Sequence, residues 1–395
     1  MSWPLVQIGR CVEKVRTWNP TGWPECIFQY VDLSSVDKSK KIIDLDDVAE
    51  ISSADAPSRA RQLVVTGDVL VATVRPNLNG VAVVPAELNG ATASTGYCVL
   101  RADEKNLHGR YLFYWVQTDS FVEEMMSKAT GANYPAVSDK IIKESQIPLP
   151  PLPEQKRIAA ILDKADAIRR KRQQAIQLAD DFLRAVFLDM FGDPVTNPKG
   201  WDEYVLNEIA DIRSGVTKGK AVKPEESVTR PYMRVANVQD GYLDLADVQQ
   251  ITVSKRDAEK CLLLDGDILL TEGGDPDKLG RGHVWRGEVE GCLHQNHIFS
   301  VRVLDKEFVR PAFLSAIISS PRGKRYFLKV GKQTTGIATI NKSVLSEFVP
   351  FIPPVTLQDK YLAVVNRIDA VKQSLAEGDV GLFNSLSHKA FAGQL

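Results

Sequence analysis

The sequence lacks the features that mark most specialised protein classes. It has five cysteines in 395 residues and no Cys-x-x-Cys pair, which excludes a disulfide framework and zinc-finger spacing. It has no apolar run of membrane-spanning length, and its first residues do not combine a basic segment with an apolar one. We therefore expect a cytoplasmic protein whose thiols are reduced.

The sequence also lacks a charge bias. Its 49 Lys and Arg against 50 Asp and Glu give a formal net charge of -1, so the overall charge offers no support for a nucleic-acid partner. Any DNA-binding surface must come from local clusters. A chain of this length, 44% hydrophobic, can bury the cores of two or more domains.

The most informative feature present is an internal repeat, offset by about half the chain. Residues 67–70 (GDVL) return as residues 266–269 (GDIL), and each copy predicts a turn followed by a buried strand. Further along, Thr130-Gly131 in the first half is matched by Thr335-Gly336 in the second, in the same order. The chain therefore contains two copies of one domain plan.

A proline-rich connector closes each copy. Residues 147–151 (IPLPP) precede Gln155, and residues 349–354 (VPFIPP) precede Gln358. Because proline fixes φ and has no amide donor, these segments should be extended and should lead into helices. This predicts two units, each a domain followed by a helix.

The first helix should be unusually long. From Pro153 the apolar residues recur every three or four positions, and no Pro or Gly interrupts before Gly192, which predicts about 38 helical residues. The second helix follows Gln358 and is interrupted by Gly378 and Gly381. Each amphipathic helix needs a mate, so the simplest arrangement packs the two antiparallel, with a globular domain at each end and pseudo-two-fold symmetry suited to paired half-sites.

Several motifs resemble one known family. Residues 149–159 (LPPLPEQKRIA) and 187–194 (FLDMFGDP) resemble the central helical region of type I restriction specificity subunits. Residues 387–395 (SHKAFAGQL) resemble the C-terminal ending of those subunits, and residues 266–269 with 295–297 (QNH) resemble strand motifs of their target-recognition domains. The second connector departs from the pattern, because Thr356 and Leu357 replace the Pro-Glu pair of the first.

The resemblance implies an α+β protein with two target-recognition domains of mixed, β-rich core, separated by two long helices packed as an antiparallel coiled coil. The implied boundaries are 1–150 and 194–352 for the domains, and 151–193 and 353–395 for the helices. Each domain would read one half of a bipartite, asymmetric DNA site, with the helices acting as a ruler in a host-defence complex. The helices would also dock two modification (methyltransferase) subunits.

By the same resemblance, this chain is not an enzyme and holds no cofactor. S-adenosylmethionine, ATP and Mg are expected in the partner subunits, which methylate adenine or, as restriction and translocase subunits, cut unmodified DNA. The residues agree in that no Gly-rich cofactor loop with an Asn/Asp-Pro-Pro-aromatic motif is found. Gly273-Gly274 is interpreted as a mobile loop, and residues 215–220 (GVTKGK) are one residue short of a phosphate loop.

Two other patterns have a chemical and a structural interpretation. Glu154-x-Lys156 has the spacing of metal-dependent nucleases, but an acidic residue in a first helical turn is better explained by the helix dipole. A zinc site could be built from four residues in the second half, but on a strand two of its histidines would face opposite sides, which disfavours it. These four residues are His283, Cys292, His294 and His297.

DNA contacts need Arg, Lys, Asn, Gln, Ser or Thr side chains on loops or helix faces. In the first half the candidates lie in two loops: Arg75, Asn77, Asn79, Lys128, Thr130, Asn133 and Tyr134. In the second half they lie in a basic run and in a further cluster: Lys324, Arg325, Lys332, Gln333, Thr334, Thr335, Lys218 and Lys220. Arg322 and Lys329 share the basic run, and Arg213 and Lys223 the cluster. A solvated basic face is the alternative for both.

The run at residues 169–172 (RRKR) on the long helix could contact phosphates, or it could be a solvated stripe or a docking face. Two rival functions remain. One is a nuclease or methyltransferase fused to a helical module, which would modify or cut DNA unaided. The other is an adaptor whose domains bind peptides and which would not retain specific DNA.

Overall fold

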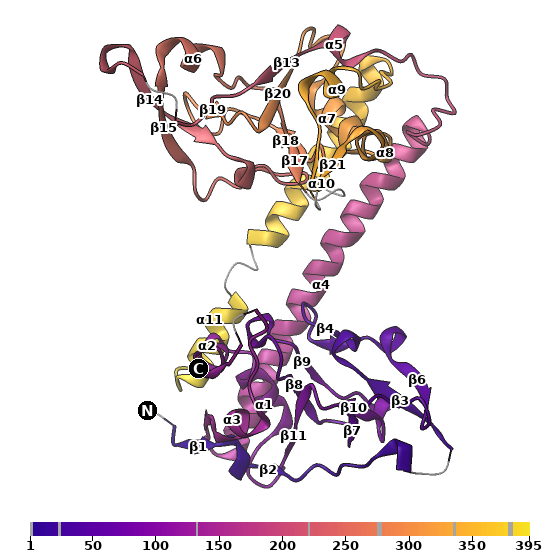
Figure 1. The fold of residues 1–395 in the computed structure, drawn as a ribbon, viewed down its shortest axis with the longest axis vertical. Helices are drawn as coiled ribbons and strands as arrows, with labels where there is room; N and C mark the ends of the chain where they lie inside the picture. Colours follow the sequence, from indigo (N-terminus) through magenta and orange to yellow (C-terminus); the bar gives the residue numbers. More distant parts are fainter. Residues whose placement is uncertain are drawn as a thin grey trace. The chain divides into compact units, whose positions relative to one another are not determined.

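The computed structural model describes residues 3–22, 25–131, 133–219, 222–274, 279–334, 337–377 and 382–395. The chain forms two compact units, one from Met1–Ile176 with Ser374–Leu395 and one from Gln177–Gln373 (Figure 1). The first unit thus combines the beginning and the end of the chain. The long helix α4 (Leu152–Phe191) contributes to both units.

An antiparallel sheet of order β2-β11-β8-β9 forms the centre of the first unit. Its strands are β2 (Val12–Glu13), β11 (Tyr97–Ala102), β8 (Val69–Ala72) and β9 (Val81–Val83). All four residues of β8 are buried, and the chain enters this strand through Gly67, whose φ of +90° suits glycine. The turn and buried strand predicted from the Gly-Asp motif are confirmed.

A second sheet of order β6-β3-β10-β7 completes the β structure of this unit, with β10 parallel to β3. Its strands are β6 (Ala49–Ser52), β3 (Ile27–Val31), β10 (Thr92–Ser94) and β7 (Ala60–Leu63). Two short pairs join β1 (Leu5–Gln7) to β12 (Gln146–Pro148) and β4 (Val36–Asp37) to β5 (Ile42–Ile43). The helices are α1 (Gly109–Trp115), α2 (Asp119–Lys128) and α3 (Asp139–Glu144).

The second unit repeats this plan. Its antiparallel sheet has the order β13-β20-β16-β18, and a second sheet, β15-β14-β19, again contains one parallel pair. The strands are β13 (Ala210–Ser214), β20 (Ile298–Val303), β16 (Ile268–Thr271), β18 (Gly282–Val284), β15 (Gln249–Ser254), β14 (Ser227–Met233) and β19 (Leu293–His294). The helices are α5 (Leu206–Ile209), α6 (Lys255–Lys260), α7 (Pro311–Ser319), α8 (Pro321–Val330) and α9 (Lys342–Ser346).

The end of the chain forms α10 (Val355–Glu377) and α11 (Leu382–Phe391). In the first unit α11 packs antiparallel to the start of α4, because Phe383 lies under Arg169 at 4.7 Å and the Leu395 carbonyl accepts from Arg157 at 3.0 Å. In the second unit the end of α4 pairs with α10 in the same sense: the Phe187 and Tyr361 rings are 5.5 Å apart, and Lys372 binds Asp180 at 2.6 Å. The predicted antiparallel pairing therefore holds within each unit.

Two buried polar clasps confirm the repeat at atomic level. Gln155 accepts from the His108 N–H and donates to the carbonyls of Asn106 and Pro150, at 2.8–2.9 Å. Gln358 does the same with the Arg310 N–H and the carbonyls of Phe308 and Pro353, at 2.8–3.1 Å. Both glutamines are fully buried, so each fixes the start of its helix to its own domain.

Candidate nucleic-acid interface

Two loops that the sequence placed among the DNA-binding candidates lie side by side in the first unit. The loop that leaves β8 bonds to the loop before α3, with Val137 N–H to the Thr73 carbonyl at 2.9 Å and Arg75 N–H to the Pro135 carbonyl at 2.7 Å. Thr130 closes the second loop through two backbone bonds with Ala136. We call residues 73–79 and 130–137 the first loop pair.

Arg75 and Tyr134 meet on this loop pair. Arg75 has a φ of +51°, rare for a residue with a side chain, and its guanidinium lies 4.5 Å from the centre of the Tyr134 ring. Tyr134 is 65% exposed, and Asn77 and Asn133 are exposed too. The loop pair therefore presents an arginine, two amides and an aromatic face to solvent.

Asn79 and Lys128, which were predicted to contact DNA, form contacts within the first unit. The Asn79 side-chain amide donates to the Gln117 carbonyl at 3.1 Å, and the Asn79 carbonyl accepts from the Lys41 ammonium, which ties the loop to its neighbours. Lys128 is ion-paired with Glu124 one turn earlier on α2, at 2.6 Å. The Asn79 side-chain nitrogen and the Lys128 ammonium are therefore already bonded within the unit, whereas the Asn79 side-chain oxygen is buried without a partner among the described residues.

Lys41 is a residue that sequence reasoning missed. It has a φ of +54°, and burial together with the charge of Arg169 lowers the pKa of Lys41 to about 8. Arg75 and Asn79 (φ +45°) also have left-handed backbone conformations, and the Lys41 ammonium bonds to the Asn79 carbonyl. Two neighbouring loops therefore contain left-handed residues that are in contact. Only the folded chain brings these residues together, so no local pattern could have found Lys41.

The second unit contains a matching loop pair, and we call its described residues 272–274, 332–334 and 337–340 the second loop pair. Ile340 N–H bonds to the Glu272 carbonyl at 2.9 Å, and β17 (Gly273–Gly274) pairs with β22 (Ile337–Thr339), which also pairs with β21 (Lys332–Thr334). The prediction of a mobile loop at Gly273-Gly274 is wrong, because these two residues form strand β17. A side chain at Gly273 would begin 2.9 Å from the Thr339 methyl carbon, so glycine permits the close pairing.

Several second-half candidates cannot be placed by their side chains. Lys220 and Thr335 lie outside the described residues, and so do the side chains of Lys332, Gln333 and Thr334. Lys218 is exposed after β13, whereas Arg213 is ion-paired with Asp211 at 2.6 Å.

The basic run on α8 divides into an inward and an outward part. Arg322, only 15% exposed, bonds to the Val349 carbonyl at 2.7 Å and to Glu203 at 2.8 Å, so its predicted place on a DNA-facing surface is wrong. Lys324, Arg325 and Lys329 are exposed, and Lys324 has a loose ion pair with Asp240 at 3.4 Å. The outward part is a basic surface beside the second loop pair.

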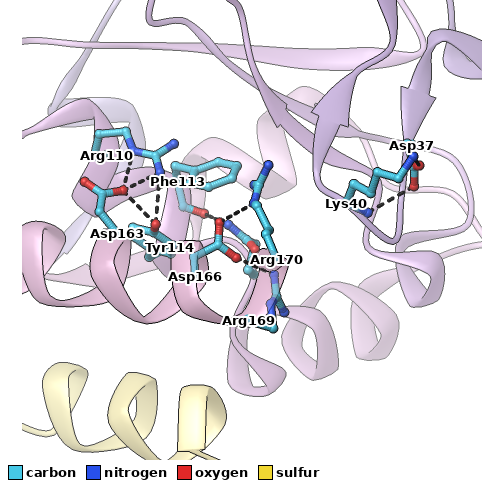
Figure 2. Close-up of polar contacts among 10 residues, drawn as sticks. Asp37, Lys40, Arg110, Phe113, Tyr114, Asp163, Asp166, Arg169 and Arg170 are labelled. Atoms are coloured by element: carbon cyan, nitrogen blue, oxygen red, sulfur yellow. Dashed lines mark hydrogen bonds and ion pairs between the residues drawn. The ribbon is translucent and has the colours of Figure 1, made fainter. Parts of the chain in front are cut away.

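The arginines of the long helix are partly used inside the first unit. Figure 2 shows the buried Asp166 carboxylate between Arg169 and Arg170, with ion pairs of 2.6 and 2.7 Å. One turn earlier, Asp163 accepts from Tyr114 at 2.7 Å and also binds Arg110, which joins α1 to α4. Arg169 and Arg170 are therefore ion-paired within the unit, so residues 169–172 are not a run of four unpaired charges.

Comparison with known proteins finds similarity to one family. Residues 66–178 match the family described as the type I restriction modification DNA specificity domain, which spans β8 to the first part of α4. The specificity subunit of the Escherichia coli K12 type I enzyme EcoKI is 24% identical over 323 residues, covering 76% of this chain and 68% of that protein. Over most of its length the chain is therefore similar to type I restriction specificity subunits.

Other known proteins show the same similarity. The StySPI specificity subunit of Salmonella potsdam is 24% identical over the same share of each chain. A solved structure from a type I restriction-modification system matches all of this chain and 98% of its own, at 24% identity and a TM-score of 0.58. The crystal structure of a type I restriction-modification system S subunit from M. genitalium matches at 16% identity and a TM-score of 0.54, covering 100% of this chain and 96% of that one. Both structures share the fold.

The residues that offered a metal-ligand or nuclease pattern in the sequence have local partners in the structure. His294 is buried and bonded to the Ile298 carbonyl at 2.9 Å, burial lowers its pKa to about 4, and His297 binds Glu272 at 2.7 Å. Among the described residues no three His, Cys, Asp or Glu side chains gather as metal ligands. Glu154 is ion-paired with Arg157 at 2.7 Å, which lowers its pKa. In the same residues no helix is long and apolar enough to cross a membrane.

Proposed function

We propose that this chain is a type I restriction specificity subunit that recognises a bipartite, asymmetric DNA site, with one half read by each unit. The supporting observation is that both units contain such a loop pair. Each loop pair follows a buried strand of the four-stranded sheet of its own unit, and an equivalent backbone hydrogen bond closes each one. The scaffold is repeated while the side chains on it differ. Two similar scaffolds with different reading groups suit two different half-sites.

The first loop pair carries groups suited to base edges. An arginine can make a bidentate bond to guanine, and an asparagine to adenine, in the major groove. Arg75, Asn77 and Asn133 are exposed for such contacts, and Tyr134 adds an aromatic face. In the second unit Lys324 and Arg325 are better suited to phosphates, whose contacts carry affinity more than sequence information.

We further propose that the chain catalyses nothing and that its helices set the half-site spacing and dock two modification subunits. Support comes from α4, which has 40 residues, or roughly 60 Å at about 1.5 Å per residue. It also exposes large apolar side chains one turn apart, Leu178 at 60% and Phe182 at 51%. Such a stripe suits protein partners. S-adenosylmethionine, ATP and Mg would then belong to the modification and restriction subunits.

The decisive experiment co-expresses this chain with the methyltransferase subunit encoded beside it and maps methylated adenines by long-read sequencing. A split motif with a fixed spacer is expected. The purified chain alone should neither methylate nor cut DNA, which separates this function from a fused enzyme. A stable complex that methylates no motif would instead favour the adaptor function.

The spacing can be tested separately. Seven residues inserted after Ile176 in α4, with seven more after Gln373 in α10, should lengthen both helices by about 10 Å, or roughly three base pairs at about 3.4 Å each. The methylated half-sites should move apart by that amount while their sequences stay the same. An unchanged spacer would contradict the ruler.

A further inference from the structure

A pocket of about 270 Å³ opens in the first unit between the end of α1, the start of α2 and the C-terminal helix α11. Its walls are mainly apolar and include Trp115, Pro148, Phe383 and Phe391, and Ser387 lies on the α11 side. The helices that frame it are neighbours in Figure 1. The pocket belongs to no loop pair, so base reading does not explain it.

The internal repeat explains why the pocket exists. Phe391 packs on Tyr111 with ring centres 5.1 Å apart, and in the second unit Phe191 packs on Phe313 at the same 5.1 Å. Tyr111 and Phe313 occupy equivalent positions, each three residues after the residue whose N–H bonds to the buried glutamine of its unit. Phe391 and Phe191 are therefore counterparts. One helical turn before them stand Ser387 in the first unit and Phe187 in the second.

Pro148 in the first unit and Phe351 in the second are a second pair of counterparts, and again only the second unit has an aromatic ring at this position. Pro148 precedes Leu149, whose N–H bonds to the Pro4 carbonyl at 2.9 Å, and Phe351 precedes Ile352, whose N–H bonds to the Asp202 carbonyl at 2.8 Å.

The second unit fills this place with its own aromatic side chains. The ring centre of Phe187 lies 6.5 Å from that of Phe351 and 5.5 Å from that of Tyr361. In the first unit a serine and a proline stand where Phe187 and Phe351 stand. The pocket is therefore the space of a missing aromatic side chain.

The lining also indicates what would bind. Trp115 packs edge-on against Phe391 at 5.1 Å, so a further ring would find aromatic walls. The Trp115 indole N–H is buried and has no acceptor among the described residues, which leaves a donor for a carbonyl of the occupant. Asp119 is exposed at the lining, where it favours a neighbouring Lys or Arg.

We propose that this pocket receives an aromatic side chain, flanked by a basic residue, from one of the two modification subunits. This inference rests on the proposed function and adds an asymmetry to it. Because Phe187 already fills the matching place in the second unit, only the copy docked on the first unit would be anchored in this way. The two copies would therefore differ in affinity.

The test is the affinity of each docked copy, measured by titrating the modification subunit onto the full chain and following the mass of the complex by light scattering. The wild-type chain should bind one copy more tightly than the other. Ser387→Phe supplies the missing ring from within and should weaken the tighter copy until the two affinities are equal. The matched control Ser387→Ala keeps the pocket open and should keep the difference.

Folding of Ser387→Phe is checked by its thermal midpoint, which should not fall, since the second unit accommodates a phenylalanine at this place. Asn384→Trp, at an exposed position of the lining, covers the pocket without touching the core and should also remove the difference in affinity. A difference that persists in both variants, or that is absent from the wild type, overturns this inference alone. A wild-type chain that binds no modification subunit overturns the proposed function as well.

Discussion

An equivalent backbone hydrogen bond holds each of the two loop pairs. It joins the Val137 N–H to the Thr73 carbonyl in the first unit and the Ile340 N–H to the Glu272 carbonyl in the second. Their surroundings differ in kind. The first offers an arginine stacked on a tyrosine, while the second lies beside the exposed lysines and arginine of α8. The comparison teaches that the repeated backbone positions a loop pair without dictating which side chains the loops present.

Beneath the loops the two units are nearly interchangeable. Asp68 binds Arg101 through two bonds of 2.8 and 2.9 Å, and Asp267 binds Arg302 through two bonds of 2.7 Å. Each aspartate also accepts the backbone N–H three residues before it, at 2.9 Å. Identical supports under different loops are what a repeat should retain, because a buried carboxylate without its partner is costly.

The largest expected effect comes from breaking these supports. Asp68→Asn and Asp267→Asn should each lower the free energy of unfolding by about 3 to 4 kcal/mol, because each leaves a half-buried guanidinium without its charge partner. Urea denaturation measures both. Asp265→Asn, at an exposed neighbouring position, is the control and should cost under about 0.5 kcal/mol. Clearly unequal losses in the two units would break their equivalence.

The glutamine clasps should follow in size. Gln155→Leu and Gln358→Leu each leave one backbone N–H and two carbonyls without their side-chain partner, so about 2 to 3 kcal/mol should be lost from the free energy of unfolding. The exposed Gln174→Leu serves as the control. If Gln155→Leu unfolded the chain more easily but Gln358→Leu did not, the second helix would be held by other contacts.

Substitutions in the first loop pair should affect reading and not stability. Arg75→Ala and Asn77→Ala should relax discrimination at one half-site by about 1 to 3 kcal/mol for each lost base contact, and should leave the other half-site unchanged. Methylome sequencing of each variant complex measures this. Glu123→Ala, exposed on α2, should keep the wild-type motif. Relaxation of both half-sites would show that the units do not read independently.

The smallest effect should come from the basic surface of the second unit. The double variant Lys324→Ala and Arg325→Ala should weaken binding to all sequences and reduce the slope of log affinity against log salt by about 2, because about 0.9 is expected for each phosphate contact. Lys128→Ala should change the slope less, since Glu124 already neutralises that lysine. Equal slopes for wild type and double variant would exclude α8 from the DNA interface.

Part of this molecule could be predicted from local pattern. The long helix between Pro153 and Gly192, the buried strands after Gly67 and Gly266, and the two-fold repeat all depend on periodicity and turn residues within short windows. Such features need no knowledge of what lies across the fold. The family resemblance depended on the same short motifs.

Other features were decided only when distant segments met. The stacking of Arg75 on Tyr134, the burial of Lys41 and the inward turn of Arg322 join residues far apart in the chain, and a basic residue looks the same in sequence whether it faces water or a carboxylate. The sequence by itself therefore determined the repeated scaffold and its helices. The tertiary structure decided which charges are free, because burial and pairing are properties of the folded surroundings and not of the residue.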